Sequence, residues 1–316
     1  MKKLLAILVI LCCVLSLVAV MSACEPDNWD NGNLNIVTTI YAEYDWTMNV
    51  LGEHADEVNV KYLLNGMDMH SYTGTFKDVY YVTTCDLLVY VGGESDEWVE
   101  KALKQSKNDN MIVIKLLDVI DDALHEADGI EGNQDEDDAM DEHVWLSLKR
   151  AQVAVNAIAE ALATLMPEDA DDLQSNATNY CQQLVELDGQ YAEVVSSSAT
   201  DTLVIADRFP FVYLFDDYGL GYYAAFAGCA SSTDPNTTTI YALADKLDEL
   251  NAKVIIITET GSEKVAKGVR DRTKNKNQKI LTLNSVQSVS SKDRKKGVTY
   301  LSLMKGNLEV LREALQ

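Results

Sequence analysis

The sequence predicts an α/β protein of two lobes, each of the βαβ type with a parallel-rich sheet, joined by one long rigid helix. Three observations predict this architecture. Short apolar segments alternate with helical segments, the alternation occurs twice along the chain, and a long amphipathic segment separates the two sets. The 316 residues are 47% hydrophobic and 24% charged, which is typical of a globular protein large enough for two domains.

The predicted strands are short runs rich in β-branched residues. They are residues 35–40, 58–64, 86–91 and 111–116 in the first half, and residues 202–206, 222–226, 253–257 and 279–283 in the second. The predicted helices are residues 44–52, 76–84, 96–105, 149–165, 211–218, 239–250, 262–272 and 299–315. Strands separated by helices pair in parallel, because each connection must cross over the sheet. Uninterrupted apolar strands such as 254–257 also indicate burial on both faces.

The segment between the two sets has the apolar stripe of a long amphipathic helix. Its apolar residues recur at alternating spacings of four and three, and they are Leu173, Ala177, Tyr180, Leu184, Leu187, Tyr191 and Val194. A helix over 168–196 would be about 40 Å long and would run the height of both lobes, with Gly189 as the position where a bend is expected. An ordinary surface helix is the alternative. The predicted division is a first lobe at 35–166, a linking helix at 167–198 and a second lobe at 199–316.

The N-terminal residues predict export from the cell. Lys2 and Lys3 precede an apolar run that ends at Leu15, and small residues then lead to Cys24. This pattern is typical of a secretory signal, and the end of the segment resembles a bacterial lipobox, whose cysteine is acylated. We therefore expect a signal peptide at 1–23, a lipid anchor on Cys24, a flexible tether at 24–34 and an extracytoplasmic protein attached to the bacterial cell membrane. An ordinary signal peptide with an incidental cysteine is the alternative.

Charge and cysteine content exclude some classes of partner and site. The formal net charge of −24 argues against nucleic acid and against binding to anionic lipid through a basic surface. Beyond Cys24 the chain has Cys85, Cys181 and Cys229, so at most one internal disulfide forms, and the spacing does not select a pair. No CxxC motif is present, which argues against a zinc site made of thiolates.

Two of the four histidines stand where α/β folds bind ligands. His70 follows the second predicted strand, and His143 immediately precedes a predicted helix, so both should lie at the crevice beyond the carboxyl ends of strands. Neutral imidazole is the commonest protein ligand for zinc and similar ions. A hydrogen-bonded structural role remains open for each. His54 is predicted to be a surface residue.

Six segments together resemble a known family. They are IVTTIY (36–41), DMHSY (68–72), DLLVYVG (86–92), DEHVWLS (141–147), ITE (257–259) and YLSLMKGNL (300–308). The chain resembles the solute-binding lipoproteins of bacterial ABC importers for zinc and manganese, the group with a rigid linking helix. This resemblance implies that His70 and His143 are the metal ligands of the first lobe, that the ion lies in the cleft between the lobes, and that the protein delivers it to an ABC permease in the membrane. It also implies that the chain is not an enzyme.

The second lobe departs from the family pattern. Many relatives provide a third histidine or a glutamate after the first strand of this lobe, where this chain has Asp207. Asp207 is a candidate ligand, with a helix N-cap or an ion pair with Arg208 as alternatives. Glu259 follows the strand at 253–257 and is expected to be a ligand or a supporting acceptor. The predicted site therefore has two imidazoles and one or two carboxylates, which favours Zn²⁺ over Mn²⁺.

An acidic segment precedes His143. Between Leu124 and Val144 it contains His125 and nine carboxylates, which are Glu126, Asp128, Glu131, Asp135, Glu136, Asp137, Asp138, Asp141 and Glu142. Family members that import zinc often carry a histidine-rich acidic loop at this place. We interpret the version in this chain as a solvated loop, with weak collection of cations as the alternative.

Two other classes of function are alternatives to metal capture. A membrane-held metallohydrolase is disfavoured because the sequence contains no HExxH, GxSxG or paired-carboxylate motif. An adhesin-like or organic-ligand-binding relative with a degenerate metal site remains the alternative, supported by Ala206, Asn284 and Gln287, where relatives have better ligands. For metal capture, the sequence predicts an affinity that falls as pH drops through about 6.5, and a small tilt of the lobes on binding.

Overall fold

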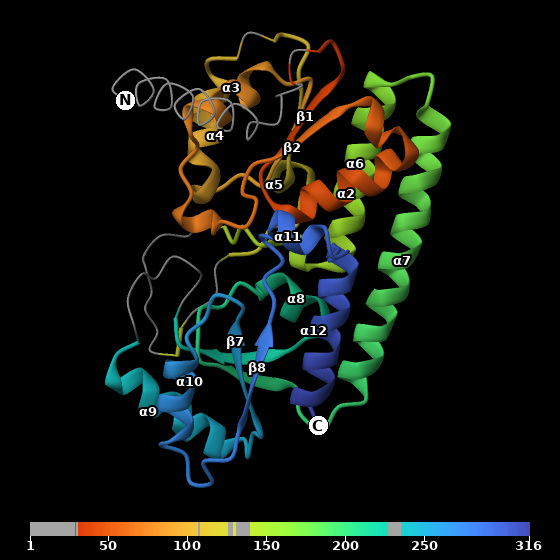
Figure 1. Cartoon of the computed structure of the whole chain (residues 1–316). Coiled ribbons are helices and arrows are strands. Elements are labelled where there is room, and N and C mark those ends of the chain that lie inside the picture. Colours follow the sequence, from red (N-terminus) through yellow and green to blue (C-terminus); the bar gives the residue numbers. More distant parts are fainter. Residues whose placement is uncertain (1–28, 30, 107, 126–128, 131–139, 227–234) are drawn as a thin grey trace, which may run out of the picture.

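The computed structural model describes residue 29 and residues 31–106, 108–125, 129–130, 140–226 and 235–316. The predicted signal peptide at 1–23 and the predicted lipid anchor at Cys24 lie outside these residues. The described residues form two α/β lobes, with one long helix along both (Figure 1). No described helix is both long enough and apolar enough to cross a membrane.

Each lobe contains a four-stranded sheet whose neighbouring strands are all parallel. The first sheet has the order β2-β1-β3-β4, with β1 at Asn35–Thr38, β2 at Asn59–Tyr62, β3 at Leu87–Tyr90 and β4 at Ile112–Lys115. The second has the order β6-β5-β7-β8, with β5 at Thr202–Ile205, β6 at Gly221–Ala224, β7 at Val254–Thr258 and β8 at Lys279–Leu283. All eight strands lie where the sequence predicts them. In both lobes the strand order reverses beside the first strand, which opens a crevice at the carboxyl end of the sheet.

The helices connect the strands and cover the sheets. In the first lobe they are α2 (Tyr41–Leu51), α3 (Phe76–Thr84), α4 (Glu97–Leu103), α5 (Leu116–Val119) and α6 (Leu148–Leu165). The linking helix is α7 (Ala170–Ser196). In the second lobe they are α8 (Val212–Tyr218), α9 (Thr237–Glu249), α10 (Glu263–Arg270), α11 (Ser291–Arg294) and α12 (Tyr300–Ala314). Short 3₁₀ turns lie at η2 (Gly52–Glu57), η3 (Met69–Ser71), η4 (Glu94–Asp96) and η5 (Val144–Leu146).

One hydrophobic core extends through both lobes. Side chains alternate across each sheet, so that Ile36 of β1 and Ile205 of β5 enter the shared core, whereas their neighbours Val37 and Val204 enter separate outer clusters. The shared core also contains side chains of α2, α6, α7 and α12. The second-lobe helix α12 packs against α2 of the first lobe as well as against α7. The lobes are therefore joined by packed side chains, not by the linking helix alone.

The structure confirms the apolar stripe predicted for the linking helix. The buried residues of α7 are Leu173, Ala177, Tyr180, Leu184, Leu187, Tyr191 and Val194, the same seven that the spacing singled out. The helix has 27 residues, starts two positions later than predicted, and continues through Gly189 without interruption. It contacts α2 and α6 in the first lobe and α8 and α12 in the second. Such a connector resists wide opening and closing of the lobes.

Two glycines provide a matched test of the helix geometry. Gly189 is exposed in the interior of α7, and an added Cβ would meet no atom within 4 Å. Gly189→Ala should therefore raise the free energy of unfolding by about 0.5–1 kcal/mol, because alanine favours the helix and restricts the unfolded chain.

Gly219→Ala is the control for this prediction. Gly219 also has open space around it, but it ends α8 in the left-handed region, at φ 68°. Alanine there should lower the free energy of unfolding by about 1 kcal/mol. Urea denaturation of both variants measures the two effects, and destabilisation by Gly189→Ala would contradict a continuous α7.

Candidate metal centre

His70 and His143 each occupy an Asp-X-His turn. His70 lies in η3, where the carboxylate Oδ1 of Asp68 accepts the His70 backbone N–H at 3.0 Å. His143 directly precedes η5, and Asp141 Oδ1 accepts its backbone N–H at 2.8 Å. In both turns the aspartate stands two residues before the histidine and fixes its backbone. The same Asp-X-His spacing occurs in the sequence at Asp68-Met69-His70 and at Asp141-Glu142-His143, and it marks both turns.

The two turns bring the imidazole rings together. The distance between His70 Nε2 and His143 Nε2 is 3.3 Å, and the ring planes are 45° apart. Zinc–nitrogen bonds of about 2.0–2.1 Å in a tetrahedral site place two nitrogens about 3.3–3.4 Å apart. The observed separation therefore matches that of two nitrogen ligands of one zinc ion.

The opposite nitrogen of each ring also has a partner. His143 Nδ1 lies 3.0 Å from Asp141 Oδ1, and both residues are buried. His70 Nδ1 lies 3.1 Å from the Ser95 hydroxyl oxygen. A carboxylate beside Nδ1 selects the tautomer that carries its proton there, which leaves the Nε2 lone pair available to a metal. The Asp141–His143 pair is the arrangement that orients metal-binding histidines in proteins.

Electrostatics keep His70 neutral. Burial lowers the pKa of His70 to about 4, with the neighbouring His143 as the next cause and Arg208 acting in the same direction, although Asp68 opposes them. An imidazole with this pKa is ready to bind a cation at neutral pH without first losing a proton. The pH of about 6.5 expected from the sequence for loss of affinity therefore does not apply to His70, whose protonation is displaced to about pH 4.

Asp207 lies two residues beyond the end of β5 and is held there by hydrogen bonds. It is buried, and its Oδ2 accepts hydrogen bonds from the Thr258 backbone N–H at 2.8 Å and the Thr258 hydroxyl at 2.7 Å. Its Oδ1 accepts the backbone N–H of Arg208 at 2.9 Å. The carboxylate thus ties the end of β5 to the end of β7, which is neither the N-cap nor the side-chain ion pair considered from the sequence.

Glu259 is exposed and hydrogen-bonded within the second lobe. Its Oε2 accepts the Ser285 backbone N–H at 2.9 Å, and its Oε1 accepts the Ser285 hydroxyl at 2.5 Å. Within the described residues, neither Glu259 nor Asp207 forms a set of three ligand atoms within 4.8 Å with the imidazole pair. The structure brings His70 and His143 together and leaves both carboxylates on hydrogen bonds of their own lobe.

The second lobe lies directly against the His70 turn. The Met69 backbone N–H donates to Gln287 Oε1 at 3.2 Å. Arg208 Nη1 lies 3.9 Å from Asp68 Oδ2, so this guanidinium of the second lobe faces the aspartate that holds His70. The imidazole pair therefore sits at the junction of the lobes. From the sequence, Gln287 was considered only as a position where relatives have better ligands, and Arg208 only as a partner of Asp207, so their contacts with the His70 turn were not predicted.

His54 belongs to a separate cluster at the start of the linking helix. Its Nδ1 lies 3.4 Å from Glu57 Oε1 and 3.8 Å from Asp169 Oδ1, and its Nε2 lies 3.5 Å from Asp172 Oδ2. Burial lowers the pKa of His54, but the three carboxylates outweigh it and raise the pKa above its usual value. The positive end of α7 favours these acids and disfavours a metal cation. We interpret the cluster as an ion-pair network, in which His54, predicted to be a surface residue, is partly exposed.

The acidic segment is described only in part. Residues 126–128 and 131–139, which hold most of its carboxylates, lie outside the described residues. The ends of the segment are joined by an antiparallel bridge between His125 and Met140. Within it, the Ile130 backbone N–H donates to the Ala224 carbonyl at 3.0 Å, so the segment reaches from the first lobe to the end of β6 in the second.

The cysteines that the structure describes form no disulfide. Cys85 is buried and Cys181 half-buried, and both are free, whereas Cys229 lies outside the described residues. Burial raises the pKa of the Cys85 thiol to about 12, so this cysteine is an unreactive member of the core.

Comparisons with known proteins agree with this geometry, which is that of a two-lobed solute-binding protein. The model of the family described as ZnuA, zinc-uptake complex component A, periplasmic, matches residues 36–314. The chain belongs to this family. The family consists of uptake components, not enzymes.

Individual relatives cover the whole chain. The zinc-binding lipoprotein AdcA of Streptococcus pneumoniae R6 is 30% identical over 99% of this chain, which spans 61% of the length of that relative. The high-affinity zinc uptake system protein ZnuA of Bacillus subtilis is 27% identical over 99% of this chain and 98% of its own length. The crystal structure of the Zn(II)-bound ZnuA-like domain of pneumococcal AdcA is similar with a TM-score of 0.72 and 29% identity, over 90% of this chain and 99% of that domain.

The low pKa of His70 predicts a small release of protons on metal binding. Two histidines with the ordinary pKa of 6.5 would together release about 1.5 protons at pH 6 when an ion displaces them. With the pKa of His70 at about 4, that ring is already neutral, so the release should stay below one proton per ion.

Calorimetric titration with zinc at pH 6, in buffers of different ionisation enthalpy, measures this number. The same titration of His70→Ala is the control. This variant should bind zinc more weakly but release as many protons as the unaltered chain, because His70 carries no proton to release. A release of about 1.5 protons by the unaltered chain would contradict a neutral His70.

Proposed function

We propose that this chain captures a divalent transition metal ion outside the cytoplasm, zinc in preference to manganese, and delivers it to an ABC permease. The observation that carries the proposal is the 3.3 Å separation of the His70 and His143 Nε2 atoms, with each Nδ1 held by a hydrogen-bonding partner. Two preoriented imidazoles form a strong half of a zinc site and a poor site for a cation that prefers only oxygen ligands. The names of the relatives support zinc.

The remaining coordination positions are assigned to the second lobe. We propose that Asp207 or Glu259 completes the site, directly or as a hydrogen-bond acceptor behind a bound water. Both carboxylates are engaged, Asp207 with Thr258 and Glu259 with Ser285, so a direct role requires exchange of these hydrogen bonds for the ion. The electrostatic gain from a divalent cation is large enough to drive such an exchange. Manganese would need more oxygen ligands than this set provides.

We expect delivery to the permease to involve only small movements of the lobes, because the shared core and α7 resist wide closure. An ion bound to His70 and His143 would order both Asp-X-His turns and the second-lobe residues that contact them. We propose that the permease recognises this ordered junction. Attachment through a lipid on Cys24 would keep the protein beside the membrane, in agreement with the name lipoprotein carried by the pneumococcal relative.

Metal content tests the proposal. The unaltered chain, equilibrated with equal concentrations of zinc and manganese and then freed of unbound metal, should retain about one zinc ion and little manganese. His70→Ala and His143→Ala should each lower zinc affinity by more than about 100-fold, because loss of a ligand costs more than loss of its hydrogen-bonded support.

His54→Ala is the matched control for these variants. It removes a histidine from the separate His54 cluster, and zinc affinity should stay at the unaltered value. Retention of manganese over zinc would overturn the metal preference. A chain that binds neither metal would overturn the proposed site and leave the organic-ligand alternative. Loss of zinc only in His54→Ala would also overturn the proposed site and would place the ion at the His54 cluster.

A further inference from the structure

The His143 turn is held from the second lobe by the hydroxyl group of Tyr213. Tyr213 belongs to α8, and its side chain is fully buried. Its hydroxyl donates to the Asp141 carbonyl oxygen at 2.9 Å and accepts the Leu124 backbone N–H at 2.9 Å. One second-lobe side chain thus joins the two backbone segments that enter and leave the acidic segment, and one of them contains the aspartate that orients His143.

The ring of Tyr213 is in turn fixed by Arg150. The Arg150 guanidinium lies over the ring at 4.7 Å from its centroid. Arg150 lies in the first turn of α6 in the first lobe, seven residues after His143, and its backbone N–H donates to the Ser147 hydroxyl at 3.1 Å. A buried guanidinium over an aromatic face favours one orientation of the ring.

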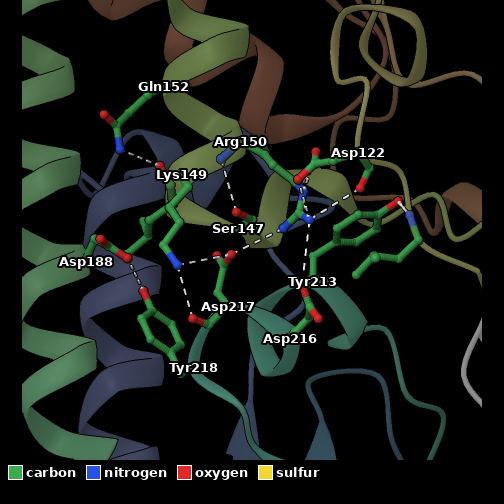
Figure 2. A network of polar contacts seen from close by, with 12 residues as sticks. Asp122, Ser147, Lys149, Arg150, Gln152, Asp188, Tyr213, Asp216, Asp217 and Tyr218 are labelled. Atoms are coloured by element: carbon green, nitrogen blue, oxygen red, sulfur yellow. Dashed lines mark hydrogen bonds and ion pairs between the residues drawn. The ribbon is translucent and has the colours of Figure 1, made fainter.

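Carboxylates of both lobes complete the network (Figure 2). Asp122, which precedes the acidic segment, accepts from Arg150 Nε at 3.1 Å and lies 2.8 Å from its Nη2. Asp217 of α8 is almost completely buried and accepts from Arg150 Nη1 at 3.2 Å. Lys149 lies 3.6 Å from the same carboxylate oxygen. Arg150 thus bonds to carboxylates of both lobes and joins α8 to the first turn of α6, although Asp217 Oδ2 is buried without a hydrogen-bond partner among the described residues.

We propose that Tyr213 is a positioning residue for the metal ligand His143, through which the second lobe controls how long the ion stays bound. The inference rests on the proposed function. Without the hydroxyl, the Leu124 N–H and the Asp141 C=O lose a shared buried partner, and the Asp141 turn gains freedom. Asp141 then orients the His143 ring less well, and the ion dissociates faster. By linkage, a bound ion must stabilise the same contact between Tyr213 and the turn.

The chain provides a matched control for Tyr213→Phe. Tyr218 lies on the same helix, and its hydroxyl donates to Asp188 Oδ1 of the linking helix at 2.7 Å (Figure 2). Its ring stacks on Tyr191, away from both Asp-X-His turns. Tyr218→Phe therefore removes a tyrosine hydroxyl of the same helix, whose hydrogen bond is to a side chain of α7 and not to the His143 turn. A merely structural role of Tyr213 would make the two variants alike.

The test compares three chains, the unaltered protein, Tyr213→Phe and Tyr218→Phe. Zinc dissociation is followed by rapid mixing with excess chelator, ligand geometry by the visible spectrum of the Co²⁺-loaded protein, and stability by thermal melting of the metal-free protein. Tyr213→Phe should release zinc about 10-fold faster and alter the Co²⁺ spectrum. Tyr218→Phe should keep the unaltered rate and spectrum, even with an equal loss of thermal stability.

Two results would overturn the inference. One is an unaltered zinc dissociation rate and spectrum in Tyr213→Phe, and the other is an equal change of both in Tyr218→Phe. If Tyr213→Phe does not fold, hydrogen exchange of the Leu124 amide in the unaltered chain, with and without zinc, tests the inference instead. Bound zinc should slow that exchange, and unchanged exchange would overturn the inference. Failure of the unaltered chain to bind zinc through His143 would instead overturn the proposed function.

Discussion

The convergence of two imidazole nitrogens at 3.3 Å is the interaction on which the structure of the centre depends. His70 and His143 are 73 residues apart in the chain, so their meeting requires the whole first lobe to be folded. Each is placed by a local device, an aspartate two residues earlier that holds the histidine backbone. Because a metal ion tolerates little error in ligand position, these two turns carry most of the preorganisation of the site.

The second lobe contacts both of these turns directly. Arg208 faces the aspartate of the His70 turn, and Tyr213 holds the aspartate of the His143 turn. The interface behind them is firmly packed, since Tyr300 donates to the Trp145 carbonyl at 2.6 Å, and Trp145 Nε1 donates to the Ser285 carbonyl at 2.8 Å. These hydrogen bonds join the two lobes directly behind both turns.

The fold could be predicted from the sequence because its signals are local and periodic. The alternation of strands and helices gave both sheets, and the spacing of apolar residues gave the buried face of α7 residue by residue. The histidines could be singled out by their place at strand and helix ends. The partners of Asp207 and Glu259 could not be predicted from the sequence, because their hydrogen bonds to Thr258 and Ser285 depend on which strands are neighbours in the sheet. Tyr213 had no local signal, since its partners lie 72 and 89 residues away.

The central claim is that one ion is bound by both Nε2 atoms. X-ray absorption spectroscopy at the zinc edge, on the chain loaded with one equivalent of zinc, tests it most directly. We expect scattering from two imidazole rings with zinc–nitrogen distances of about 2.0–2.1 Å, together with oxygen neighbours. A spectrum with one imidazole or none, or with sulfur neighbours, would contradict the account.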